Sequence, residues 1–312
     1  PKPETRNPKP ETPMANLRDL RRRRTSVAST KKITRTMELV ASAKMKKAQD
    51  AAAASRPYTE ALRELVGQLS SAAGEASAHP LMAKRAVRKV VIYVATSDRG
   101  LAGAFNANLV NKAIERADQH RAAGRQVEFV ALGKKAASTL AFNGTPAAAV
   151  HHGIMDAPKY GQAQKLAEAA MARFIAGDVD LIEVVYARFI TAARQVPDHL
   201  VLLPVGDGPV TSGAAASGAA AAKGRVKIFT FHPGAGELLA ALIPQTVKIA
   251  VFSSLLQTSA AEHAARRVAM KNATDNATEM LQLLKRTYNS ARQAQITQEI
   301  AEIVGGASAL QG

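Results

Sequence analysis

Residues Leu255 to Val304 read LLQTSAAEHAARRVAMKNATDNATEMLQLLKRTYNSARQAQITQEIAEIV, and this run contains neither proline nor glycine. Because these are the strongest helix breakers, the run predicts one uninterrupted helix of about 50 residues, roughly 75 Å long. Apolar residues recur along it at spacings of three and four, at Met280, Leu283, Leu284, Tyr288, Ala291, Ile296, Ile300 and Ile303. Such a narrow seam is typical of a coiled coil, so we predict a C-terminal coiled-coil helix over residues 247–310.

A second helical pattern occupies residues 14–74, where apolar residues again return at three or four positions. Pro57 is expected to kink or interrupt it. Two long terminal helices predict one antiparallel coiled coil, since a compact domain between them can bring the chain ends together. Residues 1–13 repeat PKPET in a proline-rich, polar context, which predicts a disordered extension.

Between the helices the period changes to alternating strands and helices. Apolar β-rich runs predict strands at Lys89–Thr96, Val127–Gly133 and Asp180–Ile190, with further candidates in HLVLLPV and VKIFTFH. Helical stretches are predicted at Asn108–Ala123, Lys134–Phe142 and Tyr160–Ala176, and a flexible loop at Gly206–Gly224. The alternation predicts an α/β fold with a largely parallel sheet, a Rossmann-like central domain over residues 88–244.

The chain carries a formal net charge of +17, which predicts an acidic partner. From Met14 to Arg56 there are 12 Lys or Arg against 3 Asp or Glu, so the N-terminal helix holds much of the excess. The absence of cysteine excludes disulfides, thiolate metal sites and cysteine nucleophiles. No apolar run approaches the ~20 residues that cross a bilayer, so we expect a soluble chain or one peripheral to a membrane.

The segment SDRGLAGAFN, Ser97 to Asn106, follows a predicted strand and opens a helix, which is where α/β proteins bind phosphates. Its glycines, Gly100 and Gly103, give only part of the G-x-G-x-x-G pattern, and no acidic residue ends the second strand. The interpretation that we favour is a tight turn in which Asp98 or Asn106 satisfies backbone groups.

The basic cluster beginning at Arg21 could bind nucleic acid, but almost no aromatic residues stand among its cations to stack on bases. An acidic protein partner is the interpretation that we favour. The seven histidines are scattered without metal-ligand spacing, and no carboxylate pair, nucleophile elbow or P-loop occurs. We therefore expect no cofactor, no metal and no catalysis by the chain itself.

The C-terminal sequence ITQEIAEIVGGASAL, Ile296 to Leu310, closely resembles the signature of the gamma subunit of F-type ATP synthases. Four further segments resemble the same family: EHAARRVAMKNATDN from Glu262, ARQAQ from Ala291, SDRGLAGAFN from Ser97 and KKITRTMELVASAKMKKAQ from Lys31. In the segment SDRGLAGAFN, Ala102 stands where the family commonly has cysteine. The resemblance implies a non-catalytic rotor shaft that couples transmembrane ion flow to ATP synthesis or hydrolysis.

The resemblance also implies partners and a location. The partners would be three α and three β subunits, the ε subunit and the c-ring, with no nucleic acid and with membrane association only through the complex. The location would be the cytoplasmic side of a bacterial inner membrane. Contacts with the α/β ring would involve Lys31, Lys32, Met37, Lys44, Lys46, Arg292, Gln293, Thr297, Gln298 and Glu299, while Asp98, Gly100, Gly103 and Asn106 would form a structural turn. The alternatives are a basic α/β protein that binds nucleic acid through helical arms and a nucleotide-dependent enzyme using the turn.

Overall fold

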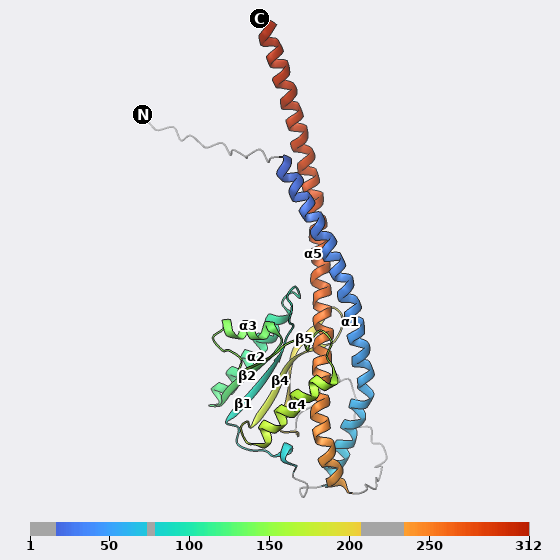
Figure 1. The fold of residues 1–312 in the computed structure, drawn as a ribbon, viewed down its shortest axis with the longest axis vertical. Coiled ribbons are helices and arrows are strands. Elements are labelled where there is room, and N and C mark those ends of the chain that lie inside the picture. The colour runs from blue at the N-terminus through green and yellow to red at the C-terminus, as the bar shows by residue number, and fades with distance from the viewer. Residues whose placement is uncertain (1–16, 74–78, 207–233, 312) are drawn as a thin grey trace, which may run out of the picture. The chain divides into compact units, whose positions relative to one another are not determined.

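The computed structural model describes residues 17–73, 79–206 and 234–311. The predicted extension at 1–13, the VKIFTFH strand and nearly all of the Gly206–Gly224 loop lie outside the described residues. The elements, in chain order, are α1 Leu17–Ala73, η2 Pro80–Met82, β1 Lys89–Ala95, α2 Phe105–Ala122, β2 Gln126–Leu132, α3 Lys134–Phe142, β3 Ala149–His151, α4 Tyr160–Ile175, β4 Leu181–Phe189, β5 Gln195–Leu203 and α5 Ala235–Gln311. The predicted fold class, long terminal helices with an α/β sheet domain between them, is confirmed (Figure 1).

The chain divides into two compact units, and both α1 and α5 contribute to each. The first unit holds the chain up to Glu38 and from Met270 onward. There the two helices run side by side (Figure 1), with Thr274 Oγ donating a hydrogen bond of 2.8 Å to Thr34 Oγ. Further along, the Arg24 guanidinium lies over the Tyr288 ring at 5.2 Å from its centroid. Arg24 precedes Thr34 on α1, whereas its partner Tyr288 follows Thr274 on α5. The two helices are therefore antiparallel.

The helix seam of this first unit follows a strict alternation of four- and three-residue steps. On α5 the line of buried or half-buried side chains with this spacing is Met270, Thr274, Ala277, Leu281, Leu284, Tyr288 and Ala291, and the half-buried Ala273 and Thr278 lie beside it. On α1 the matching side chains are Leu17, Leu20, Arg24, Val27, Lys31 and Thr34. The predicted seam is therefore right at Leu284, Tyr288 and Ala291 and wrong at Met280 and Leu283, which are exposed. A helix buries only one stripe against one partner, and these two residues lie beside that stripe.

The second unit, Leu39–Ala269, contains the sheet, with strand order β3-β2-β1-β4-β5. All pairs are parallel except β4 with β5. Alternate residues of β1 point to opposite faces of the sheet. Val90, Ile92 and Val94 pack under α2 and α3, whereas Val91, Tyr93 and Ala95 belong to the core on the other face.

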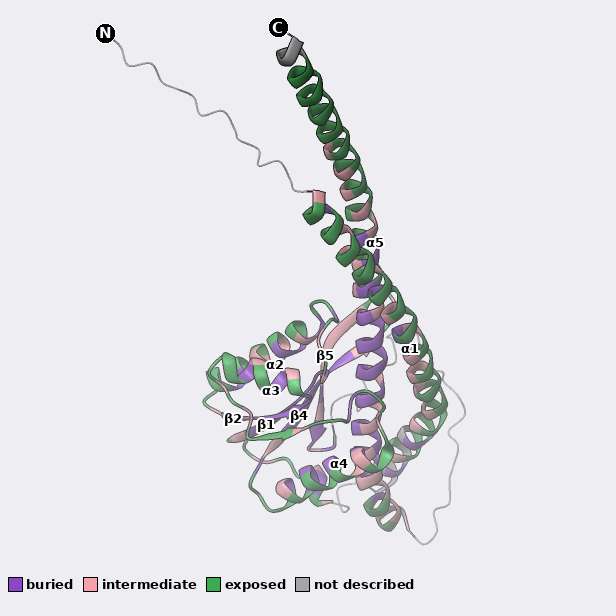
Figure 2. Cartoon of the chain, turned by 45° about the horizontal axis from the view of Figure 1, so that its top comes forward, coloured by how far each residue is buried: buried purple, intermediate pink, exposed green. Residues whose placement is uncertain are grey.

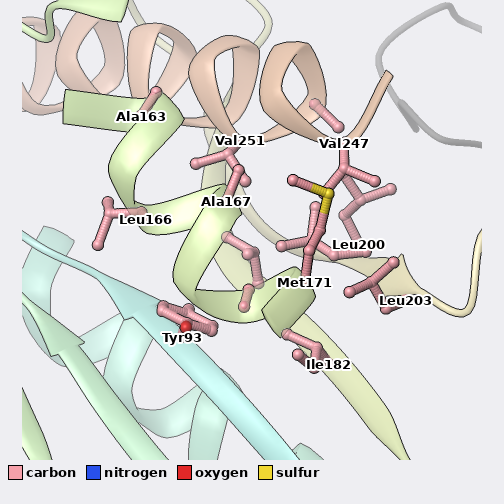
Figure 3. Packing of buried hydrophobic residues seen from close by; sticks show 14 of the residues in the cluster. Tyr93, Ala163, Leu166, Ala167, Met171, Ile182, Leu200, Leu203, Val247 and Val251 are labelled. Carbon is pink, nitrogen blue, oxygen red and sulfur yellow. The ribbon is translucent and has the colours of Figure 1, made fainter. Parts of the chain in front are cut away.

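The core on that other face is built from α4 and from the part of α5 that lies in this unit. Figure 3 shows Val247 and Val251 of α5 beside Ala163 and Ala167 of α4, above Tyr93. The Thr258 hydroxyl accepts a hydrogen bond of 3.2 Å from the backbone N–H of Ala187, beyond the last residue of β4 that pairs with β1. Thus α5 is a structural layer of the sheet domain as well as a coiled-coil helix, and Figure 2 shows it buried along the sheet.

Three local expectations differ from the structure. First, α5 begins at Ala235 rather than at 247 and continues through Pro244, because Leu239 and Ile243 are buried in the core just before the proline. Second, Pro57 does not end α1, in which its position is exposed. Third, α5 contains an 18-residue window apolar enough to cross a membrane by length and composition, contrary to our expectation. Half of that window is buried inside the protein, as in a core helix, so it is weak evidence for a span.

Candidate partner-binding surfaces

The basic residues of α1 that lie in the first unit divide between the seam and the surface. Lys31 and Met37 are half-buried, and Lys31 occupies a seam position facing α5. Lys32 is exposed, as are Arg21, Arg22 and Arg23. The exposed cations therefore form a surface that could attract an acidic partner. The half-buried Lys31 instead contributes to the helix seam, mainly through the aliphatic part of its side chain.

Two predicted contact residues in the second unit already have partners within the chain. The Lys44 ammonium donates hydrogen bonds of 2.7 Å to both carboxylate oxygens of Asp156. Lys46 pairs with Asp50 at 2.8 Å, one turn along the same helix, where both side chains are largely exposed. Lys46 can exchange this weak surface pair for another acidic group, but Lys44 is directed toward its own chain.

On α5, the predicted contact residues Arg292, Gln293, Thr297, Gln298 and Glu299 are all exposed. Gln298 donates to Glu302 at 2.9 Å, and Glu299 accepts from Gln295 at the same distance. No hydrogen bond or ion pair joins the side chain of Arg292 or Gln293 to another described residue. A guanidinium and an amide therefore stand side by side, both available to bind carboxylates or backbone groups.

An apolar stripe, Ile296, Ile300, Ile303 and Val304, accompanies these polar residues. The four side chains follow helical spacing and are between 43% and 72% exposed. In the sequence we interpreted three of them as part of the seam, but in the structure α1 does not cover them. A contiguous exposed apolar stripe of this kind is typical of a binding surface.

The turn from Ser97 to Asn106 is held by its two predicted polar side chains. Asp98 accepts hydrogen bonds from the backbone N–H of Lys134 at 3.0 Å and of Gly153 at 2.8 Å. Asn106 accepts from the backbone N–H and the hydroxyl of Ser97. Gly103 has a φ of +59°, a conformation that glycine adopts without strain, and Gly100 lies near the Lys135 side chain.

The same turn is unsuited to phosphate. In a phosphate loop, free backbone N–H groups face the ligand. Here the Asp98 carboxylate accepts the hydrogen bond of the Lys134 N–H at the start of α3. It also places a negative charge at the carboxyl ends of the strands. The nucleotide interpretation of the turn is therefore disfavoured on chemical grounds.

A buried charged group, which sequence reasoning missed, lies on α5 in the second unit. Glu262 is 3% exposed, accepts a 2.6 Å hydrogen bond from Arg266 through Oε1, and has no partner for Oε2. Burial raises the pKa of Glu262 and lowers that of His263. Among the described residues, no three His, Asp or Glu side chains are grouped so as to hold a metal ion.

Comparison with known proteins gives a consistent result. A family model described as ATP synthase matches residues 16–310. The ATP synthase gamma chain of Gemmatimonas aurantiaca is 44% identical over 301 residues, covering 96% of this chain and 100% of the relative. That of Flavobacterium psychrophilum is 41% identical over 303 residues, with the same coverage.

Solved structures share the fold. A chain from the OSCP/F1/c-ring structure of Euglena gracilis mitochondrial ATP synthase has a TM-score of 0.62 at 21% identity, covering 95% of both chains. A chain from the central stalk and c-ring of Tetrahymena thermophila mitochondrial ATP synthase has a TM-score of 0.57 at 20% identity, covering 77% of this chain and 99% of that one.

Proposed function

The chain belongs to the ATP synthase gamma chain family, and from this premise we propose which of its surfaces bind the ring of α and β subunits. It is a central-stalk, rotor-shaft subunit of an F-type ATP synthase, and the catalytic sites belong to other subunits. Our alternative, a nucleic-acid-binding protein, gains no support from these comparisons.

We propose that the end of α5 is the main ring contact. The observation that carries this proposal is the exposed stripe Ile296, Ile300, Ile303 and Val304 beside the unpaired Arg292 and Gln293. Apolar groups that a chain leaves uncovered favour burial against a partner, and Arg can hold a partner's carboxylate through two hydrogen bonds. Thr297, Gln298 and Glu299 would add polar contacts around the stripe.

We propose a second contact through the exposed cations of α1. Lys32 and Lys46 would face acidic loops of the catalytic subunits, with Lys31 and Met37 contributing from the edge of the helix seam. Exposed charges of this kind speed and orient association more than they add affinity. The α1 contact would therefore orient the shaft in the α/β ring, and the α5 contact would supply most of the affinity.

The proposed role follows from the asymmetry of the helix pair. A shaft whose faces differ offers each of three catalytic sites a different surface, so its rotation changes the three sites in turn. Binding free energy is then coupled to the angle of the shaft, which is allostery with a mechanical input. Ion flow through a c-ring would supply the rotation in synthesis, and the sheet domain would hold the c-ring and the ε subunit.

We also propose the location and stoichiometry that the family resemblance implies. The complex would contain three α and three β subunits on the cytoplasmic side of a bacterial inner membrane. This chain would associate with the membrane only through the complex, because the apolar part of α5 is already half-buried in its own sheet domain.

The test is reconstitution with the α and β subunits of the same source. A variant with Arg292→Ala and Gln293→Ala should bind the ring about tenfold more weakly or lose coupling, since exposed anchor residues cost more than about 1 kcal/mol when truncated at an interface. Truncation after Leu284 should abolish assembly. The matched control is Lys271→Ala with Asn272→Ala, an exposed cation and amide on the same helix.

The outcomes separate clearly. A single large complex whose ATPase activity depends on the end of α5 supports the proposal. If the tail variant and the Lys271 and Asn272 control assemble equally well, the tail is not the ring contact. If the wild-type chain forms no complex at all, the shaft proposal itself fails.

A further inference from the structure

The loop between β3 and α4, residues 152–159, contacts both terminal helices within the second unit. Its Asp156 carboxylate accepts two hydrogen bonds of 2.7 Å from Lys44 of α1. The Asp156 carbonyl oxygen lies 3.3 Å from Nε2 of His263, which is buried on α5. A single loop residue is thus a junction of α1, α5 and the sheet domain.

The loop is itself fixed to the sheet domain. The two residues before Asp156, Ile154 and Met155, are buried in the core formed by α4 and α5. At the other end of this short segment, the backbone N–H of Gly153 donates to Asp98, the residue that also holds the start of α3. Asp156 therefore directly follows a segment that is fixed to the sheet domain, so it cannot simply follow Lys44.

By contrast, α1 is loosely packed beyond this junction. No residue from Lys46 to Ala61 is buried in the structure, although Met45 is buried before them and Leu62 after them. Its inward-facing residues, Ala48, Ala52, Ser55 and Thr59, are small and only half-buried, so this stretch is held less firmly than the helix at Met45 and Leu62. The contact next to Met45 is therefore important for the orientation of α1.

Lys44 lies next to the buried Met45 and, together with Met45 and the buried Ala41, sets which face of α1 points outward at this place. Successive helical residues are about 100° apart around the axis, so Lys46 lies about 200° from Lys44, on the opposite side of α1, whereas Lys47 lies only about 60° from Lys44, at the edge of the inward face. Both are exposed. If the Lys44 contact were lost, these two cations could turn relative to the sheet domain.

We propose that Asp156 is a positioning residue that holds α1 at a fixed rotation against the sheet domain, so that torque on this domain reaches the helix without slip. The inference rests on the proposed shaft function and assigns Lys44, which we had expected at the α/β ring, to an internal contact instead. Lys44 also holds the pKa of Asp156 below its usual value, so the carboxylate remains charged at neutral pH.

The first test measures the tether in the isolated full chain. Asp156→Asn keeps the shape of the side chain but removes its charge. The side chains of the pair are 39% and 55% exposed, and loss of such a pair shifts an opening equilibrium about two- to fivefold. We expect amide hydrogen exchange of residues 46–61 to accelerate by that factor.

Two comparisons make this measurement specific. Asp50→Asn removes the same charge from the exposed Lys46 pair on α1 and should leave the exchange of the sheet domain and of the Lys44 region unchanged. Lys44→Gln should reproduce the effect of Asp156→Asn, and the double variant should be no worse than either, because both remove one interaction.

The second test measures coupling in the assembled synthase. With Asp156→Asn, the number of ions transported per ATP hydrolysed should fall while ATP hydrolysis itself continues, and Asp50→Asn should keep the wild-type ratio. Accelerated exchange with an unchanged ratio would show a merely structural tether and overturn the positioning role. Unchanged exchange would overturn the tether itself. Failure of the wild-type chain to assemble would instead count against the shaft proposal, without altering the exchange result.

Discussion

Gly133, at the carboxyl ends of the parallel strands, is a position where the structure allows only glycine. It joins β2 to α3 with a φ of +112°, and a Cβ atom there would lie 2.3 Å from the carbonyl oxygen of Thr96. Its N–H donates to the carbonyl oxygen of His151 of β3 at 2.8 Å, so the glycine joins the ends of β2 and β3 and lies close to the residue that follows β1. Neither the backbone nor the neighbouring strand can accommodate a side chain.

We predict that Gly133→Ala destabilises the isolated chain by about 3 kcal/mol or more, from backbone strain and a clash with the backbone that follows β1. Gly124→Ala is the matched control, because Gly124 has a φ of +75° but open space around the position of its missing Cβ. It should cost only about 1–2 kcal/mol. Urea unfolding of both variants distinguishes a clash from strain alone, and equal losses would contradict the role assigned to Thr96.

Glu128 links β2 to α4 through a pair of hydrogen bonds with the Arg173 guanidinium, at 2.8 and 3.0 Å. The side chain of Glu128 is only 23% exposed. These hydrogen bonds lower the pKa of Glu128 below its usual value, and nearby Lys89 lowers it further. A carboxyl group with a lowered pKa stabilises the folded state fully above its unfolded pKa, and this contribution is lost as pH falls through the folded pKa.

Glu128→Gln should therefore destabilise the chain by about 1–2 kcal/mol at pH 7, and by less as the pH falls below about 4.3. The measurement is urea unfolding of wild type and variant at pH 7 and at successively lower pH, with Asp118→Asn in an exposed helical pair as the control. A difference in unfolding free energy between the wild-type and variant proteins that stayed constant with pH would exclude the charged pair as its cause.

At the scale of elements, the helix seam shows what periodicity can and cannot predict. The absence of breakers predicted a long helix at each end, because helix length depends on local residue preferences. The choice between adjacent leucines could not be predicted, because Leu283 and Leu284 both fit a three- or four-residue spacing. Only the position of α1 decides that Leu284 faces the partner helix while Leu283 is 63% exposed.

Leu284→Ala should loosen the helix pair by about 1–2 kcal/mol, whereas Leu283→Ala should change its stability by less than about 0.5 kcal/mol. Hydrogen exchange of residues 17–38 measures this directly, since a loosened seam frees the facing part of α1. The pair of variants removes the same atoms from neighbouring positions, and a larger effect at Leu283 would mean that the seam is wrongly placed.

Elements of the sheet were predictable for the same local reason, with α3 found at its predicted bounds and β1 one residue shorter than expected. The edge strand β3 was missed because three residues, Ala149 to His151, give no alternating pattern. The early start of α5, at Ala235 rather than at 247, was also missed. Its packing against α4 and β5 is a tertiary effect that no local pattern contains.

At the scale of the whole molecule, the net charge of +17 indicated an acidic partner but not which one. The family resemblance carried that step, through motifs at both ends of the chain. The contacts of Lys44 could not be predicted, since Asp156 is 112 residues away along the sequence and reaches α1 only through the folded sheet domain. The sequence likewise shows an apolar residue at Ile296, Ile300 and Ile303 without showing that the chain leaves all three uncovered.

That uncovered stripe has a consequence for how a cell handles the chain. A newly made copy that has not bound its partner subunits exposes an apolar helix end. Quality-control proteases and chaperones recognise exposed apolar segments of this kind. Assembly hides this helix end. Surplus copies would then be removed and incorporated copies spared, so the supply of companion subunits would set how much of this chain persists, without any dedicated regulator.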